Sequence, residues 1–478
     1  MLFNSLAFSV FLPVVFTIYW LLAKFHFRWQ NVFILIAGYV FYGWWDWRFL
    51  SLLAFSSTMD YTYGRLLGAT ADPARRKAII IGSIITNLGL LGIFKYYNFF
   101  IGSLVESASR LGIDLHVTTL SIVLPVGISF YTFQSLSYTL DVYRNKLPPV
   151  RNMIDFLAFV SFFPQLLAGP IERATRLLPL FCRPRNFDPD AARDGLRQML
   201  WGFFKKIVIA DNCAAYVNRI FANPDAYPAS VKVVGAVYFA FQIYCDFSGY
   251  SDIAIGCARL FGFTLMRNFA FPYYSRDIAE FWRRWHISLT SWFRDYLYIP
   301  LGGSRSGRWV SVRNVLIVFL VCGLWHGANW TFVIWGLLNG LYFVPLLLLN
   351  RNRAHLDIVA AGRWLPGLRE VLQMALTFML TLVAWVFFRA ATLKAALHYL
   401  HELCSPSLIT LPREAGLSHL GPYLLLMLGI EWFQRERQHG LQMDHIKSRA
   451  FRWLVYYAIT LDIIFAGGQK QAFIYFQF

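Results

Sequence analysis

Long apolar stretches separated by short basic loops constrain the fold of this chain more than any other feature. A helix that crosses a bilayer needs about 20 mostly apolar residues. Only 15% of the residues are charged and 57% are hydrophobic, whereas soluble proteins carry about 25% charged residues. We therefore predict an all-α integral membrane protein, with a single domain over residues 1–478 and about 11–12 crossings. The expected spans lie at 4–23, 30–46, 48–68, 78–96, 119–143, 201–222, 232–262, 314–349, 369–390, 419–433 and 451–467.

The distribution of basic residues predicts an orientation. A net charge of +18 is compatible with nucleic-acid binding, but the basic residues cluster in short loops such as 24–28, 75–77 and 144–146. Cytoplasmic loops of membrane proteins carry this excess of Lys and Arg, so we expect membrane lipids and no nucleic acid as partners. Placing these loops inside puts Met1 outside, and the alternation puts the C-terminus outside too. Residues 2–22 lack a basic n-region and a small-residue cleavage site, which favours a retained helix over a signal peptide.

Several classes of enzyme are excluded by missing motifs. The six cysteines show no CxxC spacing and lie mostly in apolar stretches, so we expect neither a metal site nor a disulfide framework. The sequence has no GxxxxGK[ST] loop, no HExxH and no GxSxG. These absences argue against an ATP-driven pump, a zinc protease and a serine hydrolase.

Two aspartates are expected at membrane depth. Asp246 and Asp252 lie within YCDFSGYSDIA, inside the stretch 232–262. Intramembrane carboxylates are costly unless they are paired or face water, so both should point into the protein. A structural ion pair with a neighbouring arginine is the alternative to a functional role. The stretch 156–170 holds Pro164 and Pro170, and its short length predicts a re-entrant segment buried in protein.

The segment 276–298 combines arginines with tryptophans and has a helical pattern that ends at Gly302 and Gly303. Glu280 precedes Arg283 and Arg284 by three and four residues, which suits pairing on one helix. We predict one helix at the cytoplasmic interface. Anionic lipid headgroups would explain the basic face, and so would a docking site for an anionic donor such as a phosphate-bearing thioester.

His286 and His326 are the two of ten histidines that lie in a setting typical of catalysis. The long run 314–349 is interrupted by GLWHGAN, so we predict a hairpin or re-entrant pair that bends near His326. A histidine in an apolar span is more often structural. Here, however, glycines flank it, Trp325 is adjacent, and Asn329 could orient the imidazole or a substrate carbonyl. Neutral imidazole is a natural general base near neutral pH. Asp246, Asp252 or Glu172 could complete a triad in space.

Several long motifs, in order, resemble the bacterial branch of the membrane-bound O-acyltransferase family. They are FWRRWHISLTSWFRDYLYIPLGG and LWHGANWTFVIWGLLNG in the core 271–340, together with LPVGISFYTFQSLSYTLDVYR, FFPQLLAGPIER and YCDFSGYSDIAIG. The resemblance covers nearly the whole chain. Bacterial members O-acetylate alginate or peptidoglycan, or transfer D-alanine to teichoic acids.

The resemblance implies a fold and a site. The family fold is a ring of tilted transmembrane helices with re-entrant segments around a central tunnel, which joins a cytoplasmic donor to an extracytoplasmic acceptor. His326 matches the position regarded as catalytic, and His286 matches a second functional position that is often Asn or His. The tail 471–478 ends in AFIYFQF. In bacterial relatives a similar Phe-x-Tyr-Phe-x-Phe motif is proposed to carry the acyl group, here on Tyr475, although aromatic ends also serve as membrane-edge anchors.

We therefore expect a multi-pass O-acyltransferase of the bacterial cytoplasmic (inner) membrane. It would move an acyl group, most simply acetyl from acetyl-CoA, to an extracytoplasmic polysaccharide through a partner with a serine nucleophile, with no bound cofactor and no metal. D-alanyl transfer from a carrier protein is the alternative within the class. A lipid-linked saccharide transporter or an inactive scaffold is the alternative outside it. The expected site comprises the catalytic residues His326 and His286, positioning residues Asn329, Trp325 and Trp285, donor-binding residues Arg283, Arg284 and Arg294, and the relay Tyr475.

Overall fold

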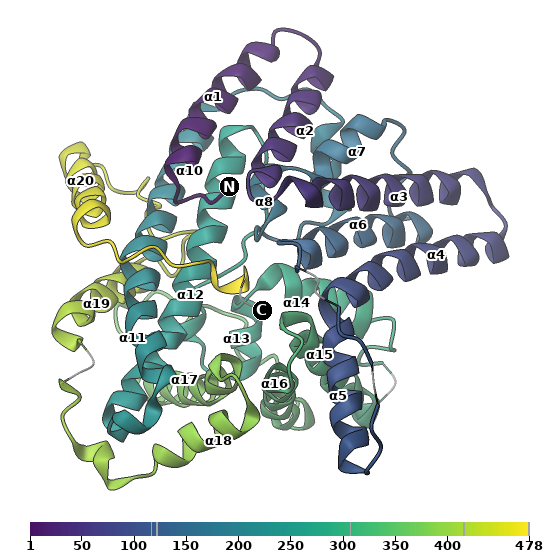
Figure 1. Ribbon diagram of the computed structural model, residues 1–478. Helices are drawn as coiled ribbons and strands as arrows, with labels where there is room; N and C mark the ends of the chain where they lie inside the picture. The colour runs from purple at the N-terminus through teal and green to yellow at the C-terminus, as the bar shows by residue number, and fades with distance from the viewer. Residues whose placement is uncertain (116, 121–122, 306, 414–415, 477–478) are drawn as a thin grey trace. The chain divides into compact units, whose positions relative to one another are not determined.

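The computed structural model describes residues 1–478 apart from 116, 121–122, 306, 414–415 and 477–478 (Figure 1). Every regular element among these described residues is a helix, as the sequence predicts. The chain forms two compact units, and each is described by itself. One unit comprises Met1–Ala192 and Cys257–Leu265, and the other comprises Arg193–Gly256 and Met266–Phe478.

The first unit is built from the N-terminal helices and is tied together by buried polar contacts. Asn31 donates to Asp155 Oδ1 and to the carbonyl of Phe181, both at 2.7 Å. Arg185 donates in turn to Asn31 Oδ1 at 2.7 Å. Its helices are α1 Leu6–Leu22, α2 Phe27–Gly43, α3 Leu50–Ala69, α4 Pro73–Leu91, α5 Tyr97–Arg110, α6 Ile128–Tyr143, α7 Met153–Val160, α8 Phe163–Leu166 and α9 Ala174–Phe181, with a short turn η1 Trp47–Phe49 and a π-helical turn η2 Gly92–Tyr96.

The second unit holds both histidines and the C-terminal tail. Two helices, α10 Pro189–Phe203 and α12 Ala229–Leu260, lie mostly in this unit. The first residues of α10 and the last residues of α12 belong to the first unit. Its other elements are a π-helical turn η3 Phe204–Ala210, α11 Asp211–Ala222, η4 Pro224–Ala226, η5 Pro272–Tyr274, α13 Ile278–Arg284, α14 Ile287–Phe293, η6 Arg294–Tyr298, α15 Arg308–His326, α16 Trp330–Leu348, α17 Leu368–Arg389, α18 Leu393–Glu402, η7 Pro406–Ile409, α19 Leu417–Phe433, α20 Arg449–Phe465 and η9 Ile474–Phe476.

Four helical segments among the described residues are long and apolar enough to cross a membrane. They are the continuous segment Pro73–Arg110 and the helices α15, α16 and α17. The apolar helix α1 is shorter, at 17 residues. These segments support a multi-pass membrane protein, while the full number of crossings and the orientation of the termini stay predictions.

Helix boundaries differ from the sequence-based expectation in several places, including the expected spans 119–143 and 78–96. The expected span 119–143 is wrong, because α6 begins only at Ile128, directly after Gly127 with φ 79°; residues 121–122 of that span lie outside the described part. The expected span 78–96 is too short, because the helix continues through η2 into α5. The polar composition of α5 hid this extension.

The predicted hairpin over 314–349 is confirmed. α15 ends at His326 and α16 begins at Trp330. A Cβ atom at Gly323 would overlap the carbonyl oxygen of Phe332, and one at Gly336 would overlap that of Phe319. Glycine is therefore required where the two helices cross. This close crossing sets the position of His326, three residues after Gly323.

Candidate functional site

His286 lies at a break in the expected interfacial helix. One helix over 276–298 is wrong: α13 ends at Arg284, and α14 begins at Ile287. His286 itself has φ 43°, in the left-handed region, which costs a non-glycine residue on the order of 1–3 kcal/mol. The backbone of an adjacent segment stabilises the break, because Ala270 N donates to Arg284 O and Ile287 N donates to Asn268 O, both at 2.9 Å.

His326 is the last residue of α15 and is buried. The C-terminus of a helix carries a partial negative charge, which stabilises a cation placed there. Asn329, predicted to position substrate, is the N-cap of α16. Its Oδ1 accepts from Thr331 N at 3.0 Å, and its Nδ2 donates to Ala391 O at 3.1 Å. Its described contacts are therefore those of a helix cap.

The structure brings His286, His326 and Tyr475 together. The ring centroids lie 6.3 Å apart for the two histidines, 5.6 Å for His326 and Tyr475, and 6.4 Å for His286 and Tyr475. These residues come from α15, from the break between α13 and α14, and from the C-terminal tail. Three segments far apart in the sequence thus converge on one point.

Aromatic rings surround the histidine pair. Trp325 lies 5.9 Å from His286 and 5.0 Å from His326. Sequence reasoning missed three further rings: Phe247 contacts His286 at 4.6 Å, and Trp335 and Phe388 contact His326 at 4.9 and 5.4 Å. Phe247 and Trp335 each lie in a motif already noted, whereas Phe388 carries no local signal. We call these residues and the two histidines the histidine cage.

Trp285, the remaining predicted positioning residue, does not contact either histidine ring among the described interactions. It is fully buried and packs against Phe269, Phe281 and Trp385 at ring distances of 5.0, 5.5 and 5.1 Å. It therefore packs next to the histidine cage and not within it, and these contacts support the break between α13 and α14 at which His286 lies.

Burial controls the charge of His286. Neither of its ring nitrogens has a hydrogen-bond partner in the part of the chain that the structure describes. The residue lies outside the helices long enough to span a membrane. Burial lowers the pKa of His286 from 6.5 to about 3, because a charged imidazolium is poorly solvated there. His286 is therefore a neutral imidazole at physiological pH.

The C-terminal tail runs from α20 to the histidine cage (yellow in Figure 1). Phe473 and Ile474 are buried, and the ring of Tyr475 lies 4.5 Å from that of Phe247. Burial raises the pKa of the Tyr475 phenol well above its ordinary value, so the hydroxyl keeps its proton unless a base removes it. The end of the predicted motif, Gln477 and Phe478, lies outside the described residues.

Asp246 and Asp252 both pair with lysines, so the alternative considered from the sequence, an ion pair with a neighbouring arginine, is wrong as to the partner. Asp246 Oδ1 lies 2.7 Å from Lys206 Nζ, and Asp252 Oδ2 lies 2.6 Å from Lys205 Nζ. Both lysines lie in η3, inside the predicted span 201–222. From the sequence we did not consider a lysine of this span as the partner of either aspartate. Glu172 belongs to the first unit.

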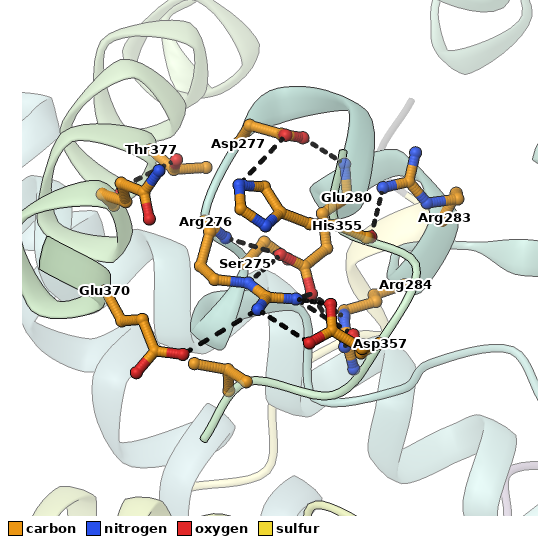
Figure 2. Close-up of polar contacts among 12 residues, drawn as sticks. Ser275, Arg276, Asp277, Glu280, Arg283, Arg284, His355, Asp357, Glu370 and Thr377 are labelled. Carbon is orange, nitrogen blue, oxygen red and sulfur yellow. Dashed lines mark hydrogen bonds and ion pairs between the residues drawn. The ribbon is translucent and has the colours of Figure 1, made fainter. Parts of the chain in front are cut away.

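The arginines of α13 and its N-terminal flank form a closed polar network, which we call the arginine cluster (Figure 2). Arg276 binds Glu280 Oε2 at 3.0 Å and Asp357 Oδ1 at 2.9 Å. Arg284 binds Glu280 Oε1 at 2.8 Å and donates to Asp357 O at 3.1 Å. Hydrogen bonding from Arg276 lowers the pKa of Asp357 below its usual range. Arg284, predicted to bind donor, thus serves this network.

A cavity of about 550 Å³ lies beside the arginine cluster. Arg283 and Arg294 both line it, as predicted donor-binding residues would, although Arg283 also donates to the carbonyls of Asn352 and His355 at 2.8 and 2.7 Å. Arg353 lines it too. The remaining wall is largely apolar and includes Ala279, Trp282, Ile287, Val315, Val318, Phe319, Phe343, Leu347 and Leu356. The cavity is therefore lined by basic side chains and by a larger apolar surface.

The helices and this site define a multi-pass membrane protein with a buried pair of histidines, of which His286 is neutral. Residues 150–388 match the membrane-bound O-acyltransferase family. The chain is 43% identical to the probable alginate O-acetylase of Pseudomonas aeruginosa, over 83% of this chain and 73% of the relative. It is 33% identical to the peptidoglycan O-acetyltransferase of Helicobacter pylori, over 100% of this chain and 98% of the relative. The teichoic acid D-alanyltransferase of Bacillus subtilis is 26% identical, over 53% and 65%.

The chain belongs to the membrane-bound O-acyltransferase family, and it is an O-acyltransferase. The match at 33% identity extends over the whole chain, so the resemblance noted from the motifs is confirmed. Neither the family nor the relatives assign roles to individual residues here. The roles of the histidine cage, the arginines and Tyr475 are therefore argued from their geometry.

Proposed function

We propose that the protein transfers an acetyl group from a cytoplasmic thioester, through Tyr475, to an extracytoplasmic polysaccharide acceptor. The observation that carries this proposal is the convergence of His286, His326 and Tyr475 within ring distances of 5.6 to 6.4 Å. A neutral imidazole beside a buried phenol forms a base and nucleophile pair. Curated relatives that act on alginate and peptidoglycan support acetyl transfer to a polymer.

In the first step His326 removes the phenol proton while the Tyr475 oxygen attacks the thioester carbonyl. The C–S bond breaks, and the proton passes from His326 to the departing thiolate, which leaves as a free thiol. The C-terminus of α15 stabilises the transient imidazolium. His286, held neutral by burial, is available to donate a hydrogen bond to the developing oxyanion.

In the second step the acetyl group leaves Tyr475 for a serine hydroxyl of an external partner. His326 removes the serine proton, and the phenol recovers one as the ester bond breaks. The partner then acylates the polysaccharide. Both steps use the same base. Because the donor is cytoplasmic and the partner is extracytoplasmic, the two substrates must reach His326 from opposite sides of the membrane. An extracytoplasmic C-terminus, as the sequence predicts, is compatible with this proposal.

For the donor we propose the cavity beside the arginine cluster. Arg294 and Arg353 in its lining suit phosphate groups, with Arg283 adjacent, and its apolar wall suits the remainder of a thioester donor. Among the three predicted donor residues Arg284 contributes indirectly, since it supports the loop that forms one wall.

D-alanyl transfer from a carrier protein is the second candidate, because teichoic acid D-alanyltransferases also match the chain. Their identity of 26% over about half of the chain favours it less than acetyl transfer. The chemistry at His326 and Tyr475 would be the same with either donor.

The experiment that tests the proposed function compares His326→Ala with the wild type in membranes that contain the partner and the polymer. An enzyme that uses His326 as its base should lose turnover by about 1,000-fold, in the range of a lost general base, while its expression and partner binding are unchanged. Turnover within threefold of wild type would exclude His326 as the base. A scaffold would be indifferent to the change, so unchanged turnover together with unchanged partner binding would point to a scaffold.

A further inference from the structure

The C-terminal tail is held against the π-helical turn η3 through its backbone. Gly468 N donates to Ile207 O at 3.0 Å, and Asn212 Nδ2 donates to Ala466 O at 2.8 Å. A Cβ atom at Gly468 would lie 2.6 Å from Asn212 N, so the chains approach as closely as glycine allows. A π-turn inserts one residue into a helix and often marks a functional site. Here it provides the surface on which the tail runs.

A buried cluster of one lysine and two aspartates, Lys206, Asp211 and Asp246, makes hydrogen bonds with the backbone of the tail at two residues. Lys206 Nζ lies 2.8 Å from Asp211 Oδ1 and 2.7 Å from Asp246 Oδ1, and it donates to the carbonyl of Gln471 at 3.3 Å. Asp246 Oδ2 accepts from the backbone N–H of Ile474 at 2.6 Å. Lys206, Asp211 and Asp246 are all buried. The tail is therefore bonded at residues 471 and 474, immediately before Tyr475.

These two bonds set the register of the tail. Its side chains are apolar or aromatic on both sides of Tyr475, with Phe473, Ile474 and Phe476 in succession. Apolar contacts tolerate a shift by one residue, because each neighbour offers a similar surface. A shift would replace the phenol with Ile474 or Phe476, and neither has a hydroxyl. Directional hydrogen bonds to the backbone distinguish the registers.

We propose that Asp246 and Lys206 are positioning residues that hold the tail in the register in which the Tyr475 hydroxyl, and no other group, faces the histidine cage. This inference rests on the proposed role of Tyr475. The carboxylate acts on the tail backbone and does not touch the reacting atoms. Asp211 shares the charge of Lys206, which keeps the lysine in place when Asp246 is replaced.

The adjacent lysine–aspartate pair is a natural control. Lys205 Nζ lies 2.6 Å from Asp252 Oδ2 and 2.9 Å from Ser248 Oγ. Gln198 donates to Asp252 Oδ1 at 2.7 Å. This pair joins η3 to α12 as the first pair does, and in the described part of the chain it makes no hydrogen bond with residues 466–475. Removing its charge changes the same helix interface without changing the register contacts.

The test measures hydrogen–deuterium exchange of the Ile474 amide and the acetyl ester on Tyr475, in the full-length detergent-solubilised protein given acetyl-CoA. The variants are Asp246→Leu, Asp246→Asn and Asp252→Asn. Asp246→Leu should speed Ile474 exchange and slow ester formation, each by at least about tenfold, since it removes the acceptor of that amide. Asp246→Asn keeps an acceptor oxygen and should give intermediate values. Asp252→Asn should match the wild type within twofold.

Two results would overturn the inference. One is Asp246→Leu with Ile474 exchange within twofold of wild type. The other is Asp252→Asn with exchange raised as much as in Asp246→Leu, which would mean that any loss of charge loosens the tail. The exchange measurement does not depend on catalysis. Faster exchange in Asp246→Leu, with Asp252→Asn unchanged, supports the positioning role even if the wild type shows no ester, and that missing ester counts against the proposed function alone. If Asp246→Leu fails to fold, the Ile474 exchange rates of Asp246→Asn and Asp252→Asn are compared instead. Faster exchange in Asp246→Asn supports the inference, and equal exchange in the two variants overturns it.

Discussion

Arg276 of the arginine cluster and His286 of the histidine cage lie ten residues apart in the sequence and have opposite polar environments. Arg276 is almost fully buried, and its guanidinium pairs with the carboxylates of Glu280, Asp357 and Glu370 and donates to a backbone carbonyl. His286 is fully buried, and its two ring nitrogens lack hydrogen-bond partners among the described residues. Arg276 has satisfied its polar groups with protein contacts, whereas His286 keeps both ring nitrogens available.

This difference separates structural from chemical roles. A buried charge must be paired, and a protein that uses paired charges gains a fixed geometry. A buried neutral imidazole without partners costs about 1–3 kcal/mol, which folding tolerates only where the group has another use. Two of the arginines expected to bind donor, Arg283 and Arg284, donate to backbone carbonyls of the loop 352–357. The histidines are therefore the better candidates for chemistry.

The largest effect on stability should come from Arg276→Met in the arginine cluster. It removes the guanidinium that pairs with Glu280 and Asp357, and leaves Glu280 with the Arg284 side chain and the backbone N–H of residue 276. We therefore expect a loss of about 3 kcal/mol, at the low end for a broken buried pair. Thermal unfolding in detergent measures it. Arg294→Met is the control, because Arg294 pairs with Asp295 in an exposed position and should cost under about 1 kcal/mol. Equal effects of the two changes would contradict the structural role of the cluster.

A smaller effect is expected from the pH dependence of His286. Its pKa is about 3 in the folded protein and near 6.5 when unfolded. Between these values the unfolded chain binds the extra proton, so stability falls as the pH drops below about 6.5. From pH 7 to pH 5 this group should cost about 2 kcal/mol. In His286→Asn the unfolding temperature should fall less steeply over that range, and parallel curves would show that His286 is charged or exposed in the folded state.

From the sequence alone we predicted the class of fold and singled out three of the six residues of the histidine cage, His286, His326 and Trp325. Apolar stretches and their lengths indicated helices, and the bend at His326 followed from a polar interruption in an apolar run. The glycines that flank His326, Gly323 and Gly327, are small enough for another backbone to approach closely, and the structure shows such an approach between α15 and α16 at Gly323. These inferences succeeded because each depends on local composition.

Predictions that depended on long-range contacts were less successful. The pattern of 276–298 is helical throughout, yet the helix is interrupted at His286. On either side of this break the backbone is hydrogen-bonded to residues 268 and 270 of the preceding segment. For Asp246 and Asp252 the structural alternative was an ion pair with an arginine, whereas the partners are two lysines about 40 residues earlier on a π-turn. The tail ended in an aromatic run that local pattern could not distinguish from an anchor. Only tertiary structure brings Tyr475 to the histidines.

The most direct test of the account is mass spectrometry of the C-terminal peptide after incubation of the purified protein with acetyl-CoA. We predict acetyl on Tyr475 in the wild type, and none in His326→Ala or Tyr475→Phe. A D-alanyl carrier protein in place of acetyl-CoA distinguishes the two candidate donors. An acyl group on Tyr475 that forms equally in His326→Ala, or the absence of any adduct with either donor while polymer acylation continues, would contradict the claim that His326 loads Tyr475.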